Sequence, residues 1–269
     1  MIGSGTFVSV MPSKSFRGMV EKRFKFPVLE ERALRLERAH KTYVNLIKRA
    51  ITVPFTSMRP ERIAGGKCQI TIIQDDLRGN GRLLADVMRS KGSKAGRVDA
   101  FRKALNESLK VYMYSNMVSG AGLRLGLESN PNNWWVRQDG RMVFLDTMPP
   151  LVSERGRVET DLLVMPDNPT LVGRLSAFLS TFRLTRELSA RMARKYAFDW
   201  PTSVRTFLVK AMDCAPDIAK ELAAAARRDV SPLGKSFTSK LSWLSISAER
   251  LKLRIYNLLA AQGGIRKGY

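Results

Sequence analysis

The spacing of hydrophobic and polar residues changes along the chain from a strand pattern to a helix pattern. Residues 2–10 and 18–24 combine glycine with alternating β-forming residues, which favours two strands. Residues 28–50 carry apolar side chains at helical spacing and predict a helix that is closed by Pro54. The apolar, β-branched run 69–74 predicts a buried strand. The first part of the chain is therefore expected to be strand-rich, with one helix.

The remainder of the chain is predicted to be mainly helical. Residues 75–81 are polar and contain glycine, so they mark the expected boundary between an N-terminal lobe (1–77) and a C-terminal lobe (78–269). Helical patterns cover 82–90, 97–118 and, with breaks at proline, 169–262. Strands with one helix, followed by many helices around a short hairpin, predict an α+β protein of two lobes.

The hairpin lies in residues 134–145. Asp139-Gly140 separates two short β-prone runs, and this pair is typical of a two-residue type I′ turn. With that turn, Asn133 would face Asp146 across the hairpin. An amide oxygen and a carboxylate so placed suit Mg²⁺, which takes one or two protein ligands besides phosphate oxygens. The alternative is that Asn133 caps one turn and Asp146 begins the next, with no metal.

Composition leaves several partner classes open. The chain has 269 residues, 44% of them hydrophobic, which is enough for a substantial core. Its net charge of +22 is spread over both halves and favours polyanions, namely nucleic acid, an acidic lipid surface or nucleotide phosphates. The basic clusters at 183–195, 225–229 and 250–254 could also dock an acidic protein partner or nucleic acid. The alternative is a positively charged surface without a dedicated partner.

Other classes of protein are disfavoured by the residues that are scarce. Cys68 and Cys214 are the two cysteines and His40 is the one histidine, so neither structural zinc nor a disulfide framework is expected. His40 is predicted to lie on the surface of its helix. The chain shows no secretory signal and no apolar run of membrane-spanning length, so we expect a soluble, cytoplasmic protein.

The segment that leads into the hairpin resembles the catalytic segment of the protein-kinase-like fold, in the branch of aminoglycoside phosphotransferases and RIO-type atypical kinases. That branch has H-G-D-x-H-P-x-N, then a strand, a glycine turn and a strand that ends in a metal-binding aspartate. Here ESNPNN, WWV, RQDGR and MVFLD follow in the same order. By this resemblance Pro131 matches the proline of the motif, and Asn133 and Asp146 would be the metal ligands.

The same segment departs from the pattern at its catalytic position. Glu128 stands where the branch has its catalytic aspartate, five residues before Asn133. Gly126 and Asn130 replace the two histidines, and Leu127 replaces the glycine. Glutamate is also a carboxylate, but its side chain is one methylene longer, and phosphoryl transfer depends on positioning.

The N-terminal lobe carries weaker parts of the resemblance. Residues 2–8 resemble a glycine-rich phosphate loop, in which Gly3 and Gly5 would let backbone N–H groups approach the phosphates. Lys22 resembles the lysine that contacts the α- and β-phosphates, and Glu37 would orient it, with Glu30 and Glu31 as rivals. The strand 69–74 resembles the strand before the adenine hinge. By this resemblance the nucleotide would be bound at the hinge by Gln74, Asp75 and Leu77.

The resemblance implies a phosphotransferase that uses ATP and Mg²⁺ on a hydroxyl-bearing acceptor, with Glu128 and Lys22 as its catalytic residues. Two alternatives remain open. One is a pseudokinase or scaffold of the same fold, which binds nucleotide without transferring phosphate. The other is a basic nucleic-acid-binding protein.

Overall fold

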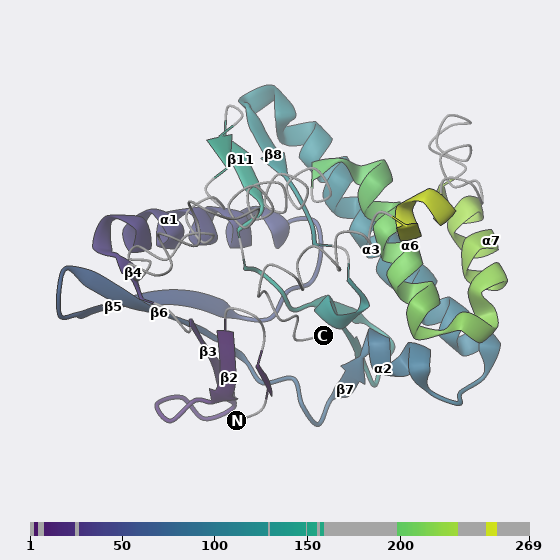
Figure 1. The fold of residues 1–269 in the computed structure, drawn as a ribbon, viewed down its shortest axis with the longest axis horizontal. Helices are drawn as coiled ribbons and strands as arrows, with labels where there is room; N and C mark the ends of the chain where they lie inside the picture. Colours follow the sequence, from purple (N-terminus) through teal and green to yellow (C-terminus); the bar gives the residue numbers. More distant parts are fainter. Residues whose placement is uncertain are drawn as a thin grey trace, which may run out of the picture.

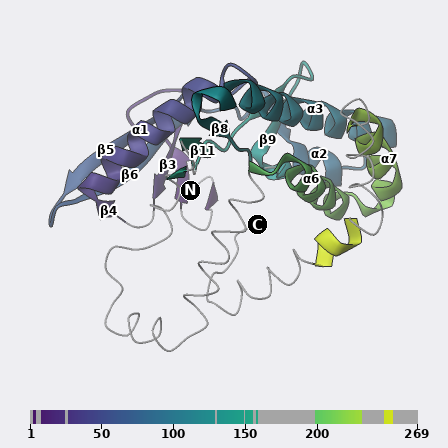
Figure 2. The ribbon, with the colours of Figure 1, turned by 90° about the horizontal axis from the view of Figure 1, so that it is seen from above.

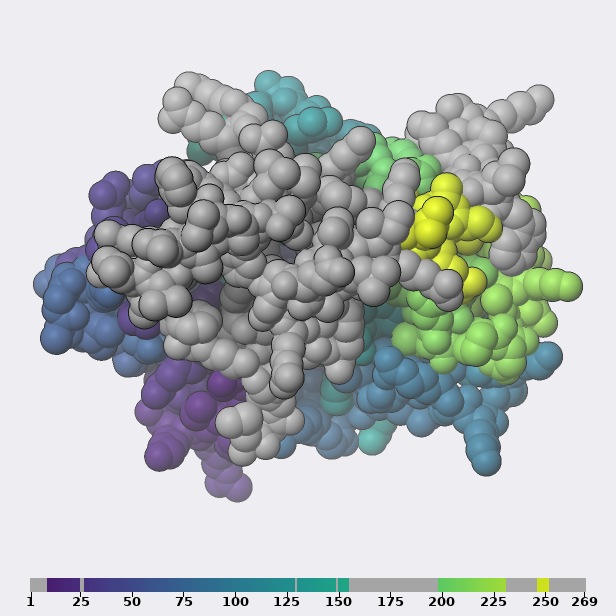
Figure 3. Space-filling model, in the orientation of Figure 1, coloured from purple at the N-terminus to yellow at the C-terminus, as the bar shows by residue number. Residues whose placement is uncertain are grey.

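The computed structural model describes residues 3–4, 8–24, 27–128, 130–148, 150–154, 157–158, 198–230 and 246–251. They form a strand-rich N-terminal part and a mainly helical part that lie side by side (Figures 1 and 2). In Figure 3 the N-terminal residues in purple and dark blue lie to the left, and helix α7, in light green, lies to the right.

The N-terminal part is built on an antiparallel sheet whose central strand is β6. Its strands are β1 (Gly3–Ser4), β2 (Val8–Pro12), β3 (Met19–Phe24), β4 (Val28–Leu29), β5 (Thr56–Ile63) and β6 (Lys67–Asp75). The strands β1, β2, β3 and β6 follow one another in the sheet, and β5 pairs with the other edge of β6. The β-branched run predicted as a buried strand therefore becomes the middle of this sheet.

Helix α1 (Glu30–Ile47) connects the two parts of the molecule. Its apolar side chains recur three or four residues apart, so one face is buried along its length. Ala33 and Leu36 belong to the core of the sheet, whereas Tyr43 and Ile47 belong to the core of the helical part. One helix thus contributes to both hydrophobic cores.

The helical part is organised around the long helix α3. Its helices are α2 (Leu84–Arg89), α3 (Lys94–Val118), α6 (Trp200–Cys214) and α7 (Ala219–Val230), with a further helical segment at 246–251. Phe101 of α3 stacks on Phe207 of α6, with ring centroids 5.4 Å apart. Paired contacts of Arg102 with Asp229 attach α3 to α7.

Two small sheets complete the helical part. The strands are β7 (Gly81–Leu83), β8 (Leu123–Leu125), β9 (Trp134–Arg137), β10 (Met142–Phe144), β11 (Val152–Glu154) and β12 (Arg157–Val158). The order is β10-β9-β7 in one sheet and β12-β11-β8 in the other. Single 3₁₀ turns are η1 (Ser119–Ala121), η2 (Pro131–Asn133) and η4 (Pro216–Ile218). Buried Trp134 and Phe144 anchor the β9–β10 hairpin to the core.

The α+β arrangement predicted from the sequence is confirmed, and it matches the two-lobed layout of a kinase-like fold. Strand β5 was not predicted, because Pro60 and its charged neighbours obscure the strand pattern in that segment. The boundary between residues 77 and 78 stays a prediction. The predicted helical pattern in 169–197, 231–245 and 252–262 lies outside the described residues. In the described part of the chain, no helix combines the length and the apolar character needed to cross a membrane.

Candidate functional site

The β9–β10 hairpin has a register one residue away from the predicted one. Trp134 pairs with Phe144, and the N–H of Leu145 donates to the carbonyl oxygen of Asn133 at 2.8 Å. Asn133 therefore faces Leu145, and the prediction that it faces Asp146 was wrong. Asp146 follows immediately at the same open end of the hairpin, so both candidate metal ligands still belong to that end.

The turn of the hairpin explains the shift in register. The N–H of Arg137 donates to the carbonyl oxygen of Arg141 at 2.9 Å, which closes a loop of three residues rather than two. Gly140 has a φ of 78°, as expected for the left-handed residue of such a loop. The carboxylate of Asp139 accepts from the N–H of Arg141 at 3.0 Å and from its guanidinium at 2.8 Å. These contacts stabilise the longer loop.

Asp146 lies within the electrostatic reach of two other predicted site residues. Burial and, after it, the charge of Glu128 raise the pKa of Asp146 to about 6, while Lys22 acts in the opposite direction. The N–H of Met148 donates to Asp146 Oδ1 at 3.3 Å. Asp146, Glu128 and Lys22 come from three separate segments, so the fold gathers an acid, a second acid and a cation.

Lys22 on β3 points towards the end of the hairpin. Its Nζ donates to the carbonyl oxygen of Leu145 at 3.1 Å, across 123 residues of sequence. Burial lowers the pKa of Lys22, and the negative charge of Asp146 opposes that shift. A partly desolvated ammonium beside a carboxylate is a suitable partner for an anionic ligand.

The residues predicted as the adenine hinge lie at the end of strand β6 and just after it. Gln74 is buried, and its Nε2 donates to the same carbonyl oxygen of Leu145 at 2.9 Å. A carboxylate oxygen of Asp75 accepts from the N–H of Phe55 at 2.7 Å. Leu77 is half-buried in the connection that follows β6. The side chains of Gln74 and Asp75 therefore already have partners within the protein.

The phosphate-loop prediction is only partly within the described structure. Gly3 pairs with Val10 between β1 and β2, so the short first strand is present. Gly5 lies outside the described residues. The role of Gly3 and Gly5 at the phosphates stays a prediction.

Three consecutive carbonyl groups hold the segment that carries Glu128. The Tyr43 hydroxyl donates to the carbonyl oxygen of Gly126 at 3.1 Å, and the Tyr112 hydroxyl donates to that of Leu127 at 3.3 Å. Asn133 Nδ2 donates to the carbonyl oxygen of Glu128 at 3.2 Å. The Glu128 side chain itself is exposed. A fixed backbone with a solvent-facing carboxylate suits a group that must meet an incoming hydroxyl.

The prediction that Glu37 orients Lys22 gains no support, whereas His40 of the same helix lies close enough for the charge of Lys22 to affect its pKa. Glu37 is half-buried, and among the contacts of the described residues no hydrogen bond or ion pair joins it to Lys22. His40 is only 2% exposed, and its Nε2 lies 3.1 Å from Thr147 Oγ1. Burial, then the charges of Lys22 and Lys48, lower the pKa of His40 to about 4.

The prediction that His40 lies on the surface was wrong. His40 follows Leu36 by four residues and precedes Tyr43 by three, and both of those side chains are fully buried. Helical periodicity therefore placed His40 on the buried face. Its polarity, and the many basic residues around it in sequence, concealed this signal.

A sequence model of one protein family matches residues 5–230. Its description is "Family of unknown function (DUF6206)". The chain belongs to this family. No curated protein matches it. The comparison with solved structures finds a mutant form of the PknI kinase domain from Mycobacterium tuberculosis, with 15% identity, 84% of each chain covered and a TM-score of 0.37. At that TM-score the likeness adds nothing to the observed arrangement of elements.

The donor set of this DUF6206 protein fits a magnesium ion. Asp146 supplies a carboxylate, and Asn133, whose amide nitrogen is bonded to Glu128, keeps its amide oxygen for another partner. Within the described ranges, no group of three or more His, Cys, Asp or Glu side chains is placed to hold a metal. Mg²⁺ suits a site with few protein ligands, because it takes its other ligands from phosphates and water.

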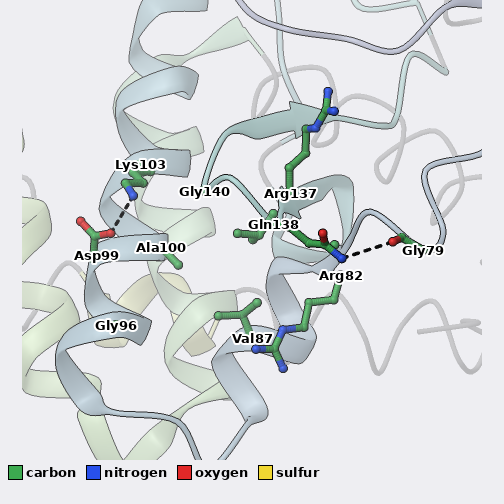
Figure 4. A pocket seen from close by; sticks show the side chains of 12 residues that line it. Gly79, Arg82, Val87, Gly96, Asp99, Ala100, Lys103, Arg137, Gln138 and Gly140 are labelled. Atoms are coloured by element: carbon green, nitrogen blue, oxygen red, sulfur yellow. Dashed lines mark hydrogen bonds and ion pairs between the residues drawn. The ribbon is translucent and has the colours of Figure 1, made fainter.

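A hollow of about 530 Å³ lies elsewhere, between the connection after β6, the start of α3 and the hairpin loop (Figure 4). None of the predicted site residues lines it. Lys103 points towards Asp99, 2.9 Å away, while the guanidinium groups of Arg82 and Arg137 point in different directions (Figure 4). The cations of this hollow do not converge on one point.

Proposed function

We propose that this protein binds ATP with Mg²⁺ and transfers the γ-phosphate to a hydroxyl-bearing acceptor. One observation carries the proposal. Lys22 of the sheet is bonded to the carbonyl group that directly precedes Asp146, and Asp146 interacts with Glu128. A cation, a metal-binding acid and a second carboxylate are the parts that phosphoryl transfer requires.

Each residue then has a definite role. Asp146 and Asn133 would hold Mg²⁺, which neutralises phosphate charge when it is bound. Lys22 would bind the α- and β-phosphates, because it is the cation of the site that points from the sheet towards the hairpin. Roles of Gly3 and Gly5 at the phosphates and of Asp75 and Leu77 at the adenine belong to the same proposal.

Glu128 would act as the base. The acceptor oxygen attacks the γ-phosphorus, the bond from that phosphorus to the β–γ bridging oxygen breaks, and the hydroxyl proton passes to the Glu128 carboxylate. ADP leaves with the bridging oxygen. The carbonyl groups held by Tyr43 and Tyr112 fix the backbone from which this carboxylate extends.

A pseudokinase is the second candidate, and the identity of residue 128 favours it. Glutamate extends one methylene further than the aspartate of the resembling families, and displacement of about 1 Å in a catalytic group is enough to cost 10²-fold in rate. In this case the site binds nucleotide in the same way and transfers no phosphate.

Two measurements separate these candidates. Thermal unfolding with ATP and Mg²⁺ should show a rise in melting temperature for the wild type and none for Asp146→Ala. ADP release should disappear in Glu128→Gln while the rise is kept. A wild type that gains stability but releases no ADP supports the pseudokinase, and a wild type with no gain contradicts both candidates.

A further inference from the structure

Helix α1 carries two buried polar side chains, three residues apart, that contact the two segments of the proposed site. Tyr43 bonds to Gly126 in the segment that carries Glu128. His40 bonds to Thr147, the residue directly after Asp146. The first contact fixes a backbone carbonyl, but the second joins two side chains that are 107 residues apart in sequence.

Thr147 is held from two sides by the N-terminal part of the molecule. Besides its contact with His40 of α1, its Oγ1 lies 3.5 Å from Thr56 Oγ1 at the start of β5. All three side chains are buried. A buried hydroxyl that loses its hydrogen bonds destabilises the fold, so this small cluster favours one position of Thr147.

The residues on either side of Thr147 have different partners. Asp146 faces the charges of Lys22 and Glu128, whereas Met148 packs against the hydrophobic core of the sheet. The N–H of Met148 also donates to Asp146 Oδ1. Because the segment is held at Thr147 and Met148, the direction of the Asp146 carboxylate depends on the N-terminal part.

We infer that His40 is a positioning residue, which fixes the Asp146 carboxylate opposite Lys22 through its hydrogen bond to Thr147. This inference rests on the proposed function, because it assigns His40 to the metal-binding end of that site. In this role His40 would contact neither nucleotide nor metal directly. It holds the segment that carries the metal ligand Asp146. Loss of residues that support metal ligands in this way typically weakens metal affinity 10- to 100-fold.

The test uses His40→Phe and Thr147→Val, singly and together, in the full chain. His40→Phe removes the hydrogen bond to Thr147, and Thr147→Val removes that bond together with the contact to Thr56. Both substitutions keep a side chain of similar volume. The readout is the Mg²⁺ concentration that half-saturates binding of a fluorescent ATP analogue. We expect a rise of roughly tenfold in each single variant, and no rise in the double variant beyond that of Thr147→Val, because the contact broken by His40→Phe is already absent in Thr147→Val.

Three comparisons separate positioning from a general loss of stability. His40→Gln keeps a hydrogen-bonding group of similar reach and should restore most of the Mg²⁺ affinity. Ser108→Ala removes a buried hydrogen bond to the carbonyl oxygen of Ala104 within helix α3, and it should leave the Mg²⁺ dependence unchanged. Without Mg²⁺, in EDTA, all variants should bind the analogue with equal affinity. If His40→Phe does not fold, Thr147→Val alone tests the inference.

The outcomes distinguish the two proposals. If the wild type binds the analogue with Mg²⁺ and both substitutions leave the half-saturating concentration unchanged, the role of His40 is contradicted while the proposed function stands. If the wild type does not bind the analogue at all, both are contradicted.

Discussion

Lys22 donates a hydrogen bond to the carbonyl oxygen of Leu145 at 3.1 Å, and this contact joins the N-terminal sheet to the end of the β9–β10 hairpin. Gln74 of the neighbouring strand β6 donates to the same oxygen at 2.9 Å. Two donors on one carbonyl group fix the residue that precedes Asp146. The sheet therefore fixes the position of the backbone from which the side chain of Asp146, the candidate metal ligand, extends.

Replacement of Lys22 by methionine tests the role of its charge. Lys22→Met should weaken ATP binding at least tenfold, because the cation proposed to bind the α- and β-phosphates is removed. The free energy of unfolding at pH 7 should change little, since a desolvated ammonium destabilises the fold and its hydrogen bond stabilises it. Nucleotide titration and urea unfolding measure the two quantities. Unchanged ATP affinity would exclude Lys22 from the phosphate site.

His40 should make the protein less stable in acid. Its pKa falls from 6.5 to about 4 on folding, so the unfolded chain takes up a proton at a higher pH than the folded chain. The stabilisation is fully present above about pH 6.5 and is lost as the pH falls towards 4, by about 3 kcal/mol at most. Urea unfolding at pH 7.5 and 4.5 should show a larger loss in the wild type than in His40→Gln. Equal losses in the two proteins would contradict the buried, neutral histidine.

Asp146 should have the opposite effect in the absence of divalent metal. Its pKa rises from 3.8 to about 6 on folding, so the folded chain takes up the proton first as the pH falls. Protonation of Asp146 should therefore contribute about 1–2 kcal/mol of stability between pH 6 and 4, a figure reduced because Asp146 is only partly buried. Unfolding in EDTA should show a smaller loss of stability over this pH range in the wild type than in Asp146→Asn. If the wild type loses more stability in acid than Asp146→Asn, the pKa of Asp146 is lowered by folding instead of raised. That result would contradict the site.

Two glycines between the sheet and the helical part form a matched pair for a packing test. A Cβ on Gly81 (φ +138°) would overlap the carbonyl oxygen of Val136, whereas a Cβ on Gly79 (φ +86°) would meet no atom within 4 Å. Gly79→Ala should cost about 1 kcal/mol from backbone strain alone. Gly81→Ala should cost about 3 kcal/mol or more, because it also displaces strand β9. Equal costs in urea unfolding would contradict the close approach of β7 to β9.

The sequence predicted the elements of the site better than their geometry. The order of Lys22, Glu128, Asn133 and Asp146 along the chain indicated that they belong together, and the fold brings Lys22, Glu128 and Asp146 within electrostatic reach. The hairpin register could not be predicted, because it depends on the contacts of Asp139 with Arg141 in the turn. These side-chain contacts selected a longer loop than Asp-Gly pairs usually form.

His40 shows a different limit of sequence interpretation. Its helical phase with Leu36 and Tyr43 predicted burial, but a buried histidine needs a partner, and Thr147 is too distant in sequence to be recognised as one. Strand β5 shows a third limit. Its pairing with β6 over its whole length overrides the low strand preference of Pro60 and its charged neighbours.

The central claim is that Lys22, Asn133 and Asp146 form a site for ATP with Mg²⁺. Isothermal titration calorimetry of the wild type with ATP, in Mg²⁺ and in EDTA, tests it most directly, with Asp146→Asn as the matched variant. We predict one binding site per chain, and affinity that falls at least tenfold in EDTA and by a similar factor in Asp146→Asn with Mg²⁺. Absence of ATP binding in the wild type, or binding that neither EDTA nor Asp146→Asn weakens, would contradict the claim.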